Sequence, residues 1–569
     1  MKDQAGLDRR TFVKGALGAG LGTAALSMFG CAPGGGSGSE APEKSSIEYP
    51  GLTSAEDFEN SAVSIEAIAE FSEEKTYDIV VVGAGTSGLP AALTALEEGA
   101  SVACLQKEDK AISQGGSSTG IVVEASTELG IKQFKQKYRQ ECSWRLNHDL
   151  LDTWVNHSGE TILWMCEKAT AAGYPPYLTA SQEVTYENDE SVVLKITNRF
   201  GPKPENNGTM IVKLAEYAEK QGVEMFYSTP GVQLVADESG AVVGVVGEAP
   251  DGSFIKFNAN KAVILATGDY QNNTSLVEKY SPDLAGFQRK QSNKTGDGIL
   301  MSMLVGGHMV PVNHSRQMHD IDSGPMTDEP FLAVGEDGKR FMNEQIGMDH
   351  WNCEVRWSGS PGNFCQIFDS SYVEQVTAWG GKPTSKEDIE NFIPGAVENP
   401  KNVIKSLIDT HRCDTLDELA GELGIPADAL KQSVERYNEL CAQGVDVDFG
   451  KEARYLQPVV EPPFYGIHKH IRITAICGGI AVDGNYQVVD EQGLPIPGLY
   501  AVGFGAGDLC GAIDWSTYVT GMSNGSCMNS GRCAALHAVR GTLEPSNPVQ
   551  WADYIEQYGA GSALGGVFH

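Results

Sequence analysis

Runs of apolar residues mark the first strands of this chain. The run from Ile79 to Val82 is apolar at every position, which is typical of a parallel strand buried on both faces. A helical pattern follows from Leu89 to Glu98, and a second apolar run extends from Val102 to Leu105. Strand, helix and strand together span about thirty residues, the length of one βαβ unit. The pattern therefore predicts a parallel sheet that begins near residue 79.

Helical and extended patterns alternate along the rest of the chain. Residues 127–222 are predicted to be mainly helical, with helices at 134–141, 150–172 and 209–221. Short apolar runs separated by turn residues predict a β-meander over 224–227, 232–236, 242–247 and 254–257, followed by a buried strand at 261–265. Further helices are expected at 294–305 and, near the end of the chain, at 521–539.

The change of pattern along the chain predicts its domain organisation. A chain of 569 residues is too long for one hydrophobic core. Residues 309–463 carry mixed short strands and helices and are predicted to form an inserted α+β domain. The flanking segments, 47–308 and 464–541, are predicted to form one discontinuous α/β domain with a parallel sheet and a β-meander. Residues 1–46 and 542–569 are expected to lie outside both domains.

The first 46 residues have the pattern of a targeting segment. Asp8-Arg9-Arg10-Thr11-Phe12-Val13-Lys14 resembles the twin-arginine export motif, and a weakly hydrophobic stretch follows from Gly15 to Gly30. Cys31 then opens a Gly/Ser-rich tether and is a candidate lipid anchor. Because the twin-arginine route moves folded proteins, we expect a cofactor loaded before export and an extracytoplasmic location.

Charge and cysteine spacing exclude several kinds of partner. The formal net charge of −33 argues against binding to nucleic acid or anionic lipid. Twelve cysteines are present, but no C-x-x-C occurs, so neither c-type haem nor the usual iron–sulfur spacing is expected. Buried reduced thiols and a cluster built from scattered cysteines both remain open.

A glycine motif follows the first predicted strand. Gly83, Gly85 and Gly88 have G-x-G-x-x-G spacing between a strand and a helix, which indicates a dinucleotide-binding turn. The carboxylate that usually ends the second strand, where it binds ribose hydroxyls, is replaced here by Gln106. Either Gln106 itself, or Glu108 or backbone in its place, is expected to bind the ribose.

Six collinear blocks resemble the flavoproteins of the fumarate reductase, urocanate reductase and 3-ketosteroid dehydrogenase superfamily, over residues 76–541. They are Val80–Gly88, Gly115–Ser118, Ala266–Gly268, Thr295–Gly298, Gly338–Glu344 and Gly498–Gly503. The resemblance implies a Rossmann-like FAD-binding domain with an inserted capping domain, and a flavin at their junction. The FAD contacts that it implies are Gly83, Gly85, Ser87, Gly88, Gln106, Lys107, Gly115, Gly116, Ser117, Ser118, Val232, Ala266, Thr267, Gly268, Asp297, Gly503 and Phe504.

The chain departs from the family pattern at several functional positions. Members with covalent flavin carry a histidine before the second glycine turn, where this chain has Ile112-Ser113-Gln114, so FAD is expected to bind non-covalently. The family's proton-donating arginine is replaced by Met348 and a substrate-binding histidine by Ala475, and residues 514–518 contain no arginine. A buried dicarboxylate needs such cations, so fumarate is not the expected substrate.

Two residues are candidates for the catalytic site. Tyr518 lies where ketosteroid dehydrogenases place a substrate-binding tyrosine, and a phenol can donate a hydrogen bond or a proton to a carbonyl. A core tyrosine bonded to backbone is the alternative. His314 lies near a third substrate position of the family, and the nearby Arg316 and His319 are expected to be surface charges.

The resemblance implies an exported FAD-dependent reductase of an activated C=C bond in an apolar small molecule. Enones, lactones and acrylates are candidate substrates, and the cardiac-glycoside-reductase-like branch is one candidate group of relatives. Electrons would come from a separate membrane-bound or multihaem cytochrome, as in anaerobic respiration. Two alternatives stay open: a ketosteroid-type dehydrogenase that runs in the opposite direction, and a non-catalytic flavoprotein that transfers electrons or binds a ligand.

Overall fold

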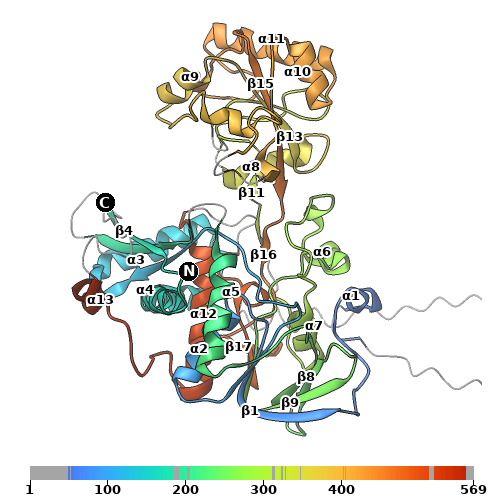
Figure 1. The fold of residues 1–569 in the computed structure, drawn as a ribbon, viewed down its shortest axis with the longest axis vertical. Helices are drawn as coiled ribbons and strands as arrows, with labels where there is room; N and C mark the ends of the chain where they lie inside the picture. The colour runs from blue at the N-terminus through green and yellow to red at the C-terminus, as the bar shows by residue number, and fades with distance from the viewer. Residues whose placement is uncertain are drawn as a thin grey trace, which may run out of the picture. The chain divides into compact units, whose positions relative to one another are not determined.

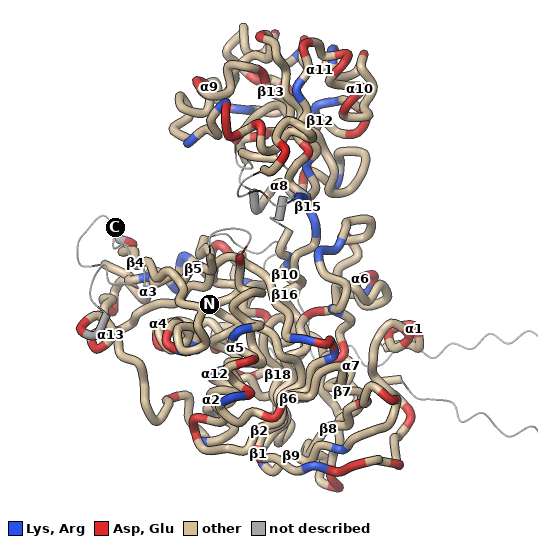
Figure 2. Tube along the Cα trace, in the orientation of Figure 1, with Lys and Arg blue, Asp and Glu red and all other residues tan. Residues whose placement is uncertain are grey.

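The computed structural model describes residues 49–558, apart from 51–52, 185–190, 202–204, 311–313, 319, 322–323, 327–328, 347, 401–402, 404 and 512–517. The export motif, Cys31, His319 and most of the 514–518 loop lie outside the described residues. Among the helices that are described, none combines the length and apolar character needed to cross a membrane. Acidic residues are spread along the chain rather than gathered in one segment (Figure 2).

An eight-stranded sheet forms the core of the molecule, and it confirms the predicted α/β class (Figure 1). Five strands are parallel, in the order β18-β9-β1-β2-β6, and the β7-β8 meander pairs with β9. Ile79 is in register with Val102 on one side and with Ala262 on the other. The strands are β1 (Glu73–Val82), β2 (Val102–Leu105), β6 (Glu224–Phe226), β7 (Gly231–Ala236), β8 (Val242–Glu248), β9 (Phe254–Leu265), β17 (Gln487–Val489) and β18 (Pro495–Ala501).

Strand β9 differs from its prediction. The sequence pattern indicated two strands, at 254–257 and 261–265, but one continuous strand spans both. Its first half pairs antiparallel with β8, and along its length it pairs parallel with β1. It pairs with β1 on one edge and with β8 and then β18 on the other, so the polar residues Asn258 and Asn260 do not interrupt it.

Residues 127–222 are mainly helical, and helices α3 (Glu128–Glu141), α4 (His148–Ala171) and α5 (Asn207–Gln221) lie at the three predicted places. Two strands that were not predicted, β4 (Tyr177–Val184) and β5 (Val192–Arg199), lie between α4 and α5. They pair with β3 (Ser117–Val122) in a three-stranded sheet, in the order β3-β5-β4.

The signal available in the sequence was the group of β-branched residues Val192, Val193, Ile196 and Thr197, which favour strands. In the structure, buried and partly exposed residues alternate from Leu194 to Asn198.

Glycines allow the helices to approach the sheets closely. Helix α12 (Met522–Arg540) packs against α2 (Gly88–Glu97), α4 (His148–Ala171) and β3 (Figure 1). A Cβ at Gly525 would lie 2.1 Å from the Thr119 carbonyl oxygen, and one at Gly531 would lie 1.9 Å from that of Ser87. The other helices near these sheets are α1 (Ala55–Glu59), α3 (Glu128–Glu141), α5 (Asn207–Gln221), α6 (Thr274–Tyr280), α7 (Asp297–Leu304) and α13 (Trp551–Tyr558).

A five-stranded antiparallel sheet lies in the inserted segment. It comprises β11 (Asp320–Ile321), β12 (Leu332–Val334), β13 (Asn363–Phe368), β14 (Thr410–Cys413) and β15 (Phe464–Arg472). Its helices are α8 (Met348–Glu354), α9 (Tyr372–Ala378), α10 (Leu416–Leu423) and α11 (Ala427–Gln443). Strands β10 (Ser315–Gln317) and β16 (Ala475–Cys477) pair where the chain enters and leaves the insert. Because β15 pairs with β13 and β14, we propose that the insert extends to residue 472 rather than 463.

Candidate cofactor and substrate site

The turn after β1 is closely packed at two glycines and open at the third. A Cβ at Gly83, whose φ is +109°, would lie 2.4 Å from the Ala266 carbonyl oxygen, and one at Gly88 would lie 1.7 Å from that of Gly83. At Gly85 the nearest atom would be the Ile112 carbonyl oxygen, at 3.5 Å. Gly83 and Gly88 are therefore needed for packing, whereas Gly85 leaves free space beside the backbone.

That free space opens into two pockets. The first is lined by Val82, Gly83, Ala84, Gly85, Leu105, Gln106, Lys107, Ile112, Pro230, Gly231, Ala266, Thr267, Asn293, Lys294 and Asp297. The second is lined by Gly85, Thr86, Ser87, Ile112, Ser113, Gln114, Ala266, Gly268, Asp269, Gln291, Lys294, Thr474, Ala475, Gly503, Phe504, Asn524 and Cys527. Four residues line both, so the two pockets are neighbours along one groove at the end of β1 and β9.

Polar side chains at the first pocket are held by one another. Lys107 Nζ donates to Thr295 Oγ1 at 2.8 Å and to Asp297 Oδ2 at 3.1 Å. Gln106 Nε2 donates to the Lys110 carbonyl oxygen at 2.7 Å, and its Oε1 lies 3.4 Å from the Ala84 amide. The Gln106 side-chain amide thus links the glycine turn to the Lys110 backbone, and the Asp297 carboxylate lies in the lining of the first pocket.

Three buried oxygens at the second pocket have no hydrogen-bond partner. They are Gln114 Oε1, Gln291 Oε1 and Thr474 Oγ1, each on a residue that lines the pocket. A buried polar atom without a partner is costly, so these atoms indicate a polar ligand. Reasoning from the sequence did not select Gln291, Lys294 or Thr474, although Lys294 opens the Thr295–Gly298 block.

The N-terminus of α12 also meets the second pocket. Asn524, in its first turn, lines the pocket and donates through Nδ2 to the Ser117 carbonyl oxygen at 3.1 Å. A Cβ at Gly115 would lie 2.1 Å from the same Nδ2, whereas one at Gly116 would meet nothing within 4 Å. The free amides at a helix N-terminus favour negative charge.

Some predicted cofactor contacts lie beside the pockets rather than in their lining. These are Gly88, Gly115, Gly116, Ser117, Ser118 and Val232. Ser118 Oγ donates to Asn198, and the Val232 carbonyl oxygen accepts from Ser64 at 2.9 Å. The other eleven predicted contacts line one or both pockets.

The second pocket holds one acidic and one basic side chain. Burial raises the pKa of Asp269, and the Lys294 ammonium partly opposes this shift. The Lys294 side chain crosses Gly268, where a Cβ would lie 2.6 Å from Nζ. Within the described lining, Lys294 is the single Lys or Arg.

Tyr518 has a different environment from the one predicted. Its hydroxyl donates to Glu183 Oε1 at 2.5 Å, and its ring stacks on Phe134 and lies 4.4 Å from Lys137 Nζ. Burial, followed by the hydrogen bond to Glu183, raises the pKa of the phenol far above its usual value. Since Tyr518 does not line the second pocket, it corresponds to the core-type alternative, with a side-chain carboxylate as its acceptor in place of backbone.

His314 is buried beside Gly478, which lies in the segment by which the chain leaves the insert. A Cβ at Gly478 would lie 2.7 Å from its ring, which stacks on Tyr280 with centroids 5.5 Å apart, and its Nδ1 is hydrogen-bonded to the Tyr270 hydroxyl. Burial lowers the His314 pKa to about 4, so the imidazole is neutral at pH 7. A neutral imidazole is a weak general acid, and His314 does not line either pocket.

Arg316 is not the surface charge that was predicted. Only 4% of the residue is exposed, and its guanidinium binds Asp283. Arg356 binds the same carboxylate at 2.9 Å. Both of these arginines therefore have a carboxylate partner within the chain.

The Gly338–Glu344 block takes part in buried ion pairs within the insert. Arg340 Nε and Nη2 donate to the two carboxylate oxygens of Glu344 at 2.8 and 2.9 Å, and buried Lys451 lies 3.3 Å from Glu344. Four residues later Met348 begins α8. Ala475 lines the second pocket, where relatives would have a histidine.

A cavity of about 940 Å³ lies elsewhere and is lined by residues that include Tyr280, Gly306, His308 and Asp490. It shares no residue with the two pockets and contains none of the predicted contacts, so we do not assign the cofactor to it.

Comparison with known proteins shows the family of this chain. Residues 78–515 match the model of the FAD binding domain family. A vinyl phenol reductase from Lactiplantibacillus plantarum is 28% identical over 84% of this chain and 99% of its own length. A fumarate reductase (cytochrome) from Shewanella frigidimarina is 26% identical over 82% of this chain and 77% of its own.

Two solved structures share the fold. The open conformation of a flavocytochrome c3 fumarate reductase has a TM-score of 0.63 at 22% identity, covering 83% of this chain and 80% of that one. A 3-ketosteroid delta1-dehydrogenase from Sterolibacterium denitrificans has a TM-score of 0.61 at 19% identity, covering 82% of this chain and all of that one. The resemblance to this group of flavoproteins is confirmed.

The groove fits the cofactor of this family. Gly85 leaves open space for a pyrophosphate, and unpartnered oxygens and a helix N-terminus mark the second pocket. The chain belongs to the FAD binding domain family, and it is an FAD-dependent oxidoreductase acting on CH–CH groups.

Proposed function

We propose that this protein is an exported reductase of an activated C=C bond in a small molecule other than a dicarboxylate, such as a vinyl-substituted phenol or an enone. One observation carries the choice of substrate: no arginine occurs in the described lining of the second pocket. The similarity to a vinyl phenol reductase over nearly all of that protein's length supports the proposal.

The charges near the pocket favour a neutral substrate. A carboxylate that leaves water needs a paired cation, because an unpaired buried charge is expensive. Lys294 is the one described cation in the lining, and it shares the pocket with Asp269. Arg316 and Arg356 are both bound to Asp283. A dicarboxylate would have to displace these partners, whereas a phenol or an enone would not.

The lining offers hydrogen bonds that suit such a substrate. With FAD held by residues of the groove, hydride-transfer chemistry would be available at the alkene. The Thr474 hydroxyl can donate to a substrate oxygen, and the Gln114 and Gln291 amide oxygens can accept from a phenol. The Lys294 ammonium would stabilise negative charge as it develops during the reaction, a contribution that depends on water being excluded.

We also propose an electron donor for this protein and a location for it. We propose a separate cytochrome as electron donor, which the similarity to a fumarate reductase (cytochrome) supports. The Arg9-Arg10 motif and Cys31 support export and lipid anchoring.

An anaerobic assay of FAD-loaded protein with reduced viologen tests this function. We expect oxidation of the viologen on addition of 4-vinylphenol or of an enone. The rate with fumarate should be at least about 100-fold lower, which corresponds to a difference of about 2.7 kcal/mol in activation free energy. Lys294→Met should slow turnover per bound FAD, and Lys290→Met, whose parent residue lies outside the lining of both pockets, is the matched control. Faster turnover of fumarate than of every neutral alkene would refute the proposal.

A further inference from the structure

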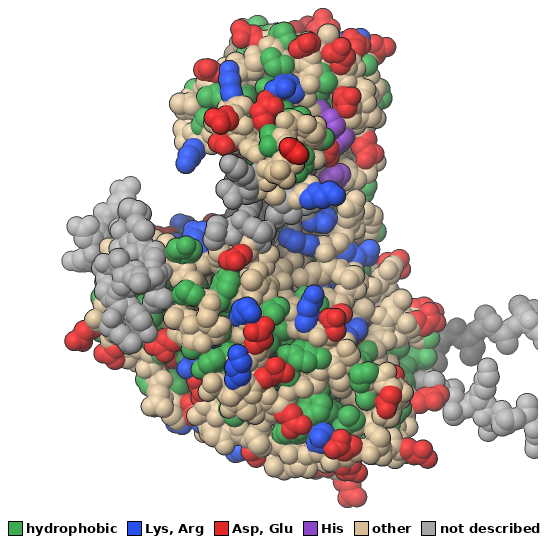
Figure 3. All heavy atoms as spheres, viewed as in Figure 1, with side chains coloured by type: hydrophobic (Ala, Val, Ile, Leu, Met, Phe, Trp, Pro, Cys, Tyr) green, Lys and Arg blue, Asp and Glu red, His purple; other side chains and the backbone are tan. Residues whose placement is uncertain are grey.

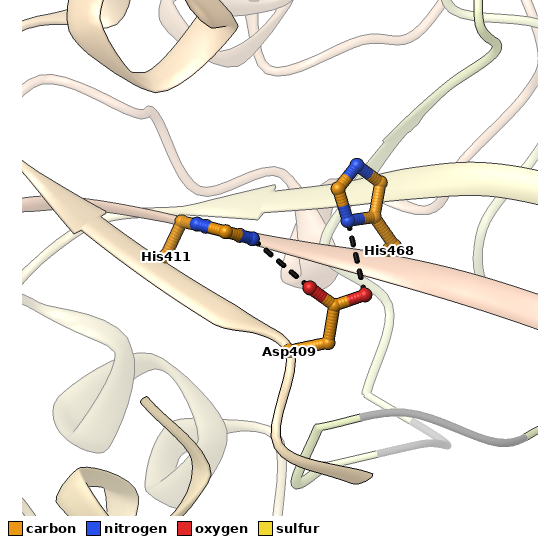
Figure 4. A group of neighbouring side chains, drawn as sticks. All are labelled: Asp409, His411 and His468. Carbon is orange, nitrogen blue, oxygen red and sulfur yellow. Dashed lines mark hydrogen bonds and ion pairs between the residues drawn. The ribbon is translucent and has the colours of Figure 1, made fainter. Parts of the chain in front are cut away.

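Asp409, His411 and His468 converge in the inserted segment, away from the two pockets (Figure 4). Asp409 directly precedes β14, His411 lies within it, and His468 lies on β15, which pairs with β14. His411 Nε2 is 3.0 Å from Asp409 Oδ1, and His468 Nδ1 is 3.1 Å from Asp409 Oδ2. One ligand atom from each residue lies within 4.8 Å of the others.

Each imidazole has a second acceptor on its opposite nitrogen. His468 Nε2 donates to the Leu423 carbonyl oxygen at 2.9 Å, and His411 Nδ1 lies 3.4 Å from Glu422 Oε2. Both acceptors belong to the last turn of α10, which packs against β14 and β15. An acceptor on the outer nitrogen fixes ring orientation and tautomer, as it does for histidines that bind metals.

The tautomer of His468 decides which of its ring nitrogens has a lone pair that can bind a cation. A carbonyl oxygen can only accept, so Nε2 carries hydrogen. In a neutral ring, Nδ1 then presents a lone pair toward a carboxylate oxygen, which is repulsive unless a cation lies between them.

We propose that Asp409, His411 and His468 bind one divalent transition-metal ion of the zinc class. Two imidazole nitrogens and one carboxylate are a common ligand set for such ions, and water would complete a four-coordinate shell. Ligands at 2.0–2.2 Å from a tetrahedral zinc are separated by about 3.3 Å. In the cluster, the 3.0 and 3.1 Å distances run to the two different oxygens of Asp409, and one ligand atom from each residue lies within 4.8 Å of the others, so the side chains would draw closer together around a bound ion.

The cluster is accessible to ions. The three side chains are between 16 and 32% exposed. Histidine side chains are visible at the surface of the part of the chain that holds the five-stranded sheet, next to acidic side chains (Figure 3). The bound ion would join β14 and β15 and, through Glu422 and Leu423, α10. Its role is structural, and it does not depend on the proposed reductase function.

The alternative to a metal site is an arrangement in which two protonated imidazoles share Asp409. A zinc titration distinguishes these two arrangements. Full-length, FAD-loaded protein is stripped with a chelator, and zinc binding is measured by competition with a chromogenic chelator. We expect wild type to bind one equivalent more than His411→Gln and than Asp409→Asn. Glu422→Gln should retain the site with about 10- to 100-fold weaker binding.

His470→Gln is the matched control, because His470 lies on the same strand but is bonded to Asn363 at 2.8 Å. This variant should bind as many equivalents as wild type. FAD content and melting temperature in chelator show whether each variant is folded. Equal zinc stoichiometry in wild type, Asp409→Asn and His411→Gln, with all three folded, would overturn the proposal. So would a loss of one equivalent in His470→Gln alone.

Discussion

His314 illustrates how burial sets the properties of a single residue. The ring is enclosed by Gly478, Tyr270 and Tyr280, and its pKa falls to about 4, against about 6.5 in an unfolded chain. Between these two values the unfolded chain binds a proton that the folded protein does not. Stability must therefore fall as the pH is lowered through this range.

The expected contribution of His314 is a loss of about 2 kcal/mol in unfolding free energy between pH 7.5 and pH 5. His314→Gln should lack this component, whatever its own stability at pH 7.5. Urea unfolding of both proteins at the two pH values measures the difference. The same pH dependence in both proteins would show that His314 is not buried in its neutral form.

The Tyr518 hydroxyl is expected to contribute to stability rather than to turnover. Tyr518→Phe removes the donor to Glu183, which keeps Lys195 at 2.8 Å and Lys137 at 3.4 Å. We expect a loss of about 1 kcal/mol in unfolding free energy, with kcat within a factor of about three of wild type. Urea unfolding and viologen-linked turnover measure the two effects. A drop in kcat of about 10²-fold at unchanged FAD content would instead place the hydroxyl at the reacting atoms.

At the scale of elements, the strand–turn–helix unit has two kinds of glycine. Gly88→Ala places a Cβ 1.7 Å from a backbone oxygen, and neither group can move without shifting the strand or the helix. We expect a loss of about 1–3 kcal/mol or more in the unfolding free energy of the FAD-free protein.

Gly85→Ala is the informative comparison, because its Cβ would make only an ordinary contact, at 3.5 Å. The FAD-free protein should keep its stability within about 0.5 kcal/mol, while FAD binds more weakly because the methyl occupies the approach to the pyrophosphate. Urea unfolding without FAD and a flavin-fluorescence titration measure these effects. Unchanged FAD affinity in Gly85→Ala would mean that the pyrophosphate lies elsewhere.

At the scale of the whole molecule, the mode of FAD attachment is the property to test. Ile112, Ser113 and Gln114 precede the second glycine turn, and all three line the second pocket without offering a histidine for a covalent bond. Acid precipitation should therefore release yellow colour to the supernatant. Added FAD should also raise the melting temperature of the FAD-free protein, since a ligand at 100 times its Kd stabilises by about 2.7 kcal/mol. Colour that stays in the pellet would demonstrate a covalent link.

Local patterns in the sequence determined the framework of this protein. The apolar run of β1, the spacing of Gly83, Gly85 and Gly88, and the apolar run of β2 predicted a dinucleotide-binding unit, because each depends on residues that are near one another in the chain. The α/β class and FAD follow from that unit together with the collinear family blocks. The absence of the usual cations at Met348 and Ala475 was also visible without a structure.

Contacts between distant segments were decided only by the tertiary structure. Tyr518 meets Glu183 across 335 positions, and Arg316 binds Asp283, which no local pattern indicates. Gln114 and Thr474, 360 positions apart in the chain, line one pocket, where Gln114 Nε2 donates to the Thr474 carbonyl oxygen at 2.9 Å. Asp409 and His468 become neighbours because β14 pairs with β15. Side-chain partners, and the pKa shifts that they cause, depend on which surfaces the fold brings together, and that information is not local in the chain.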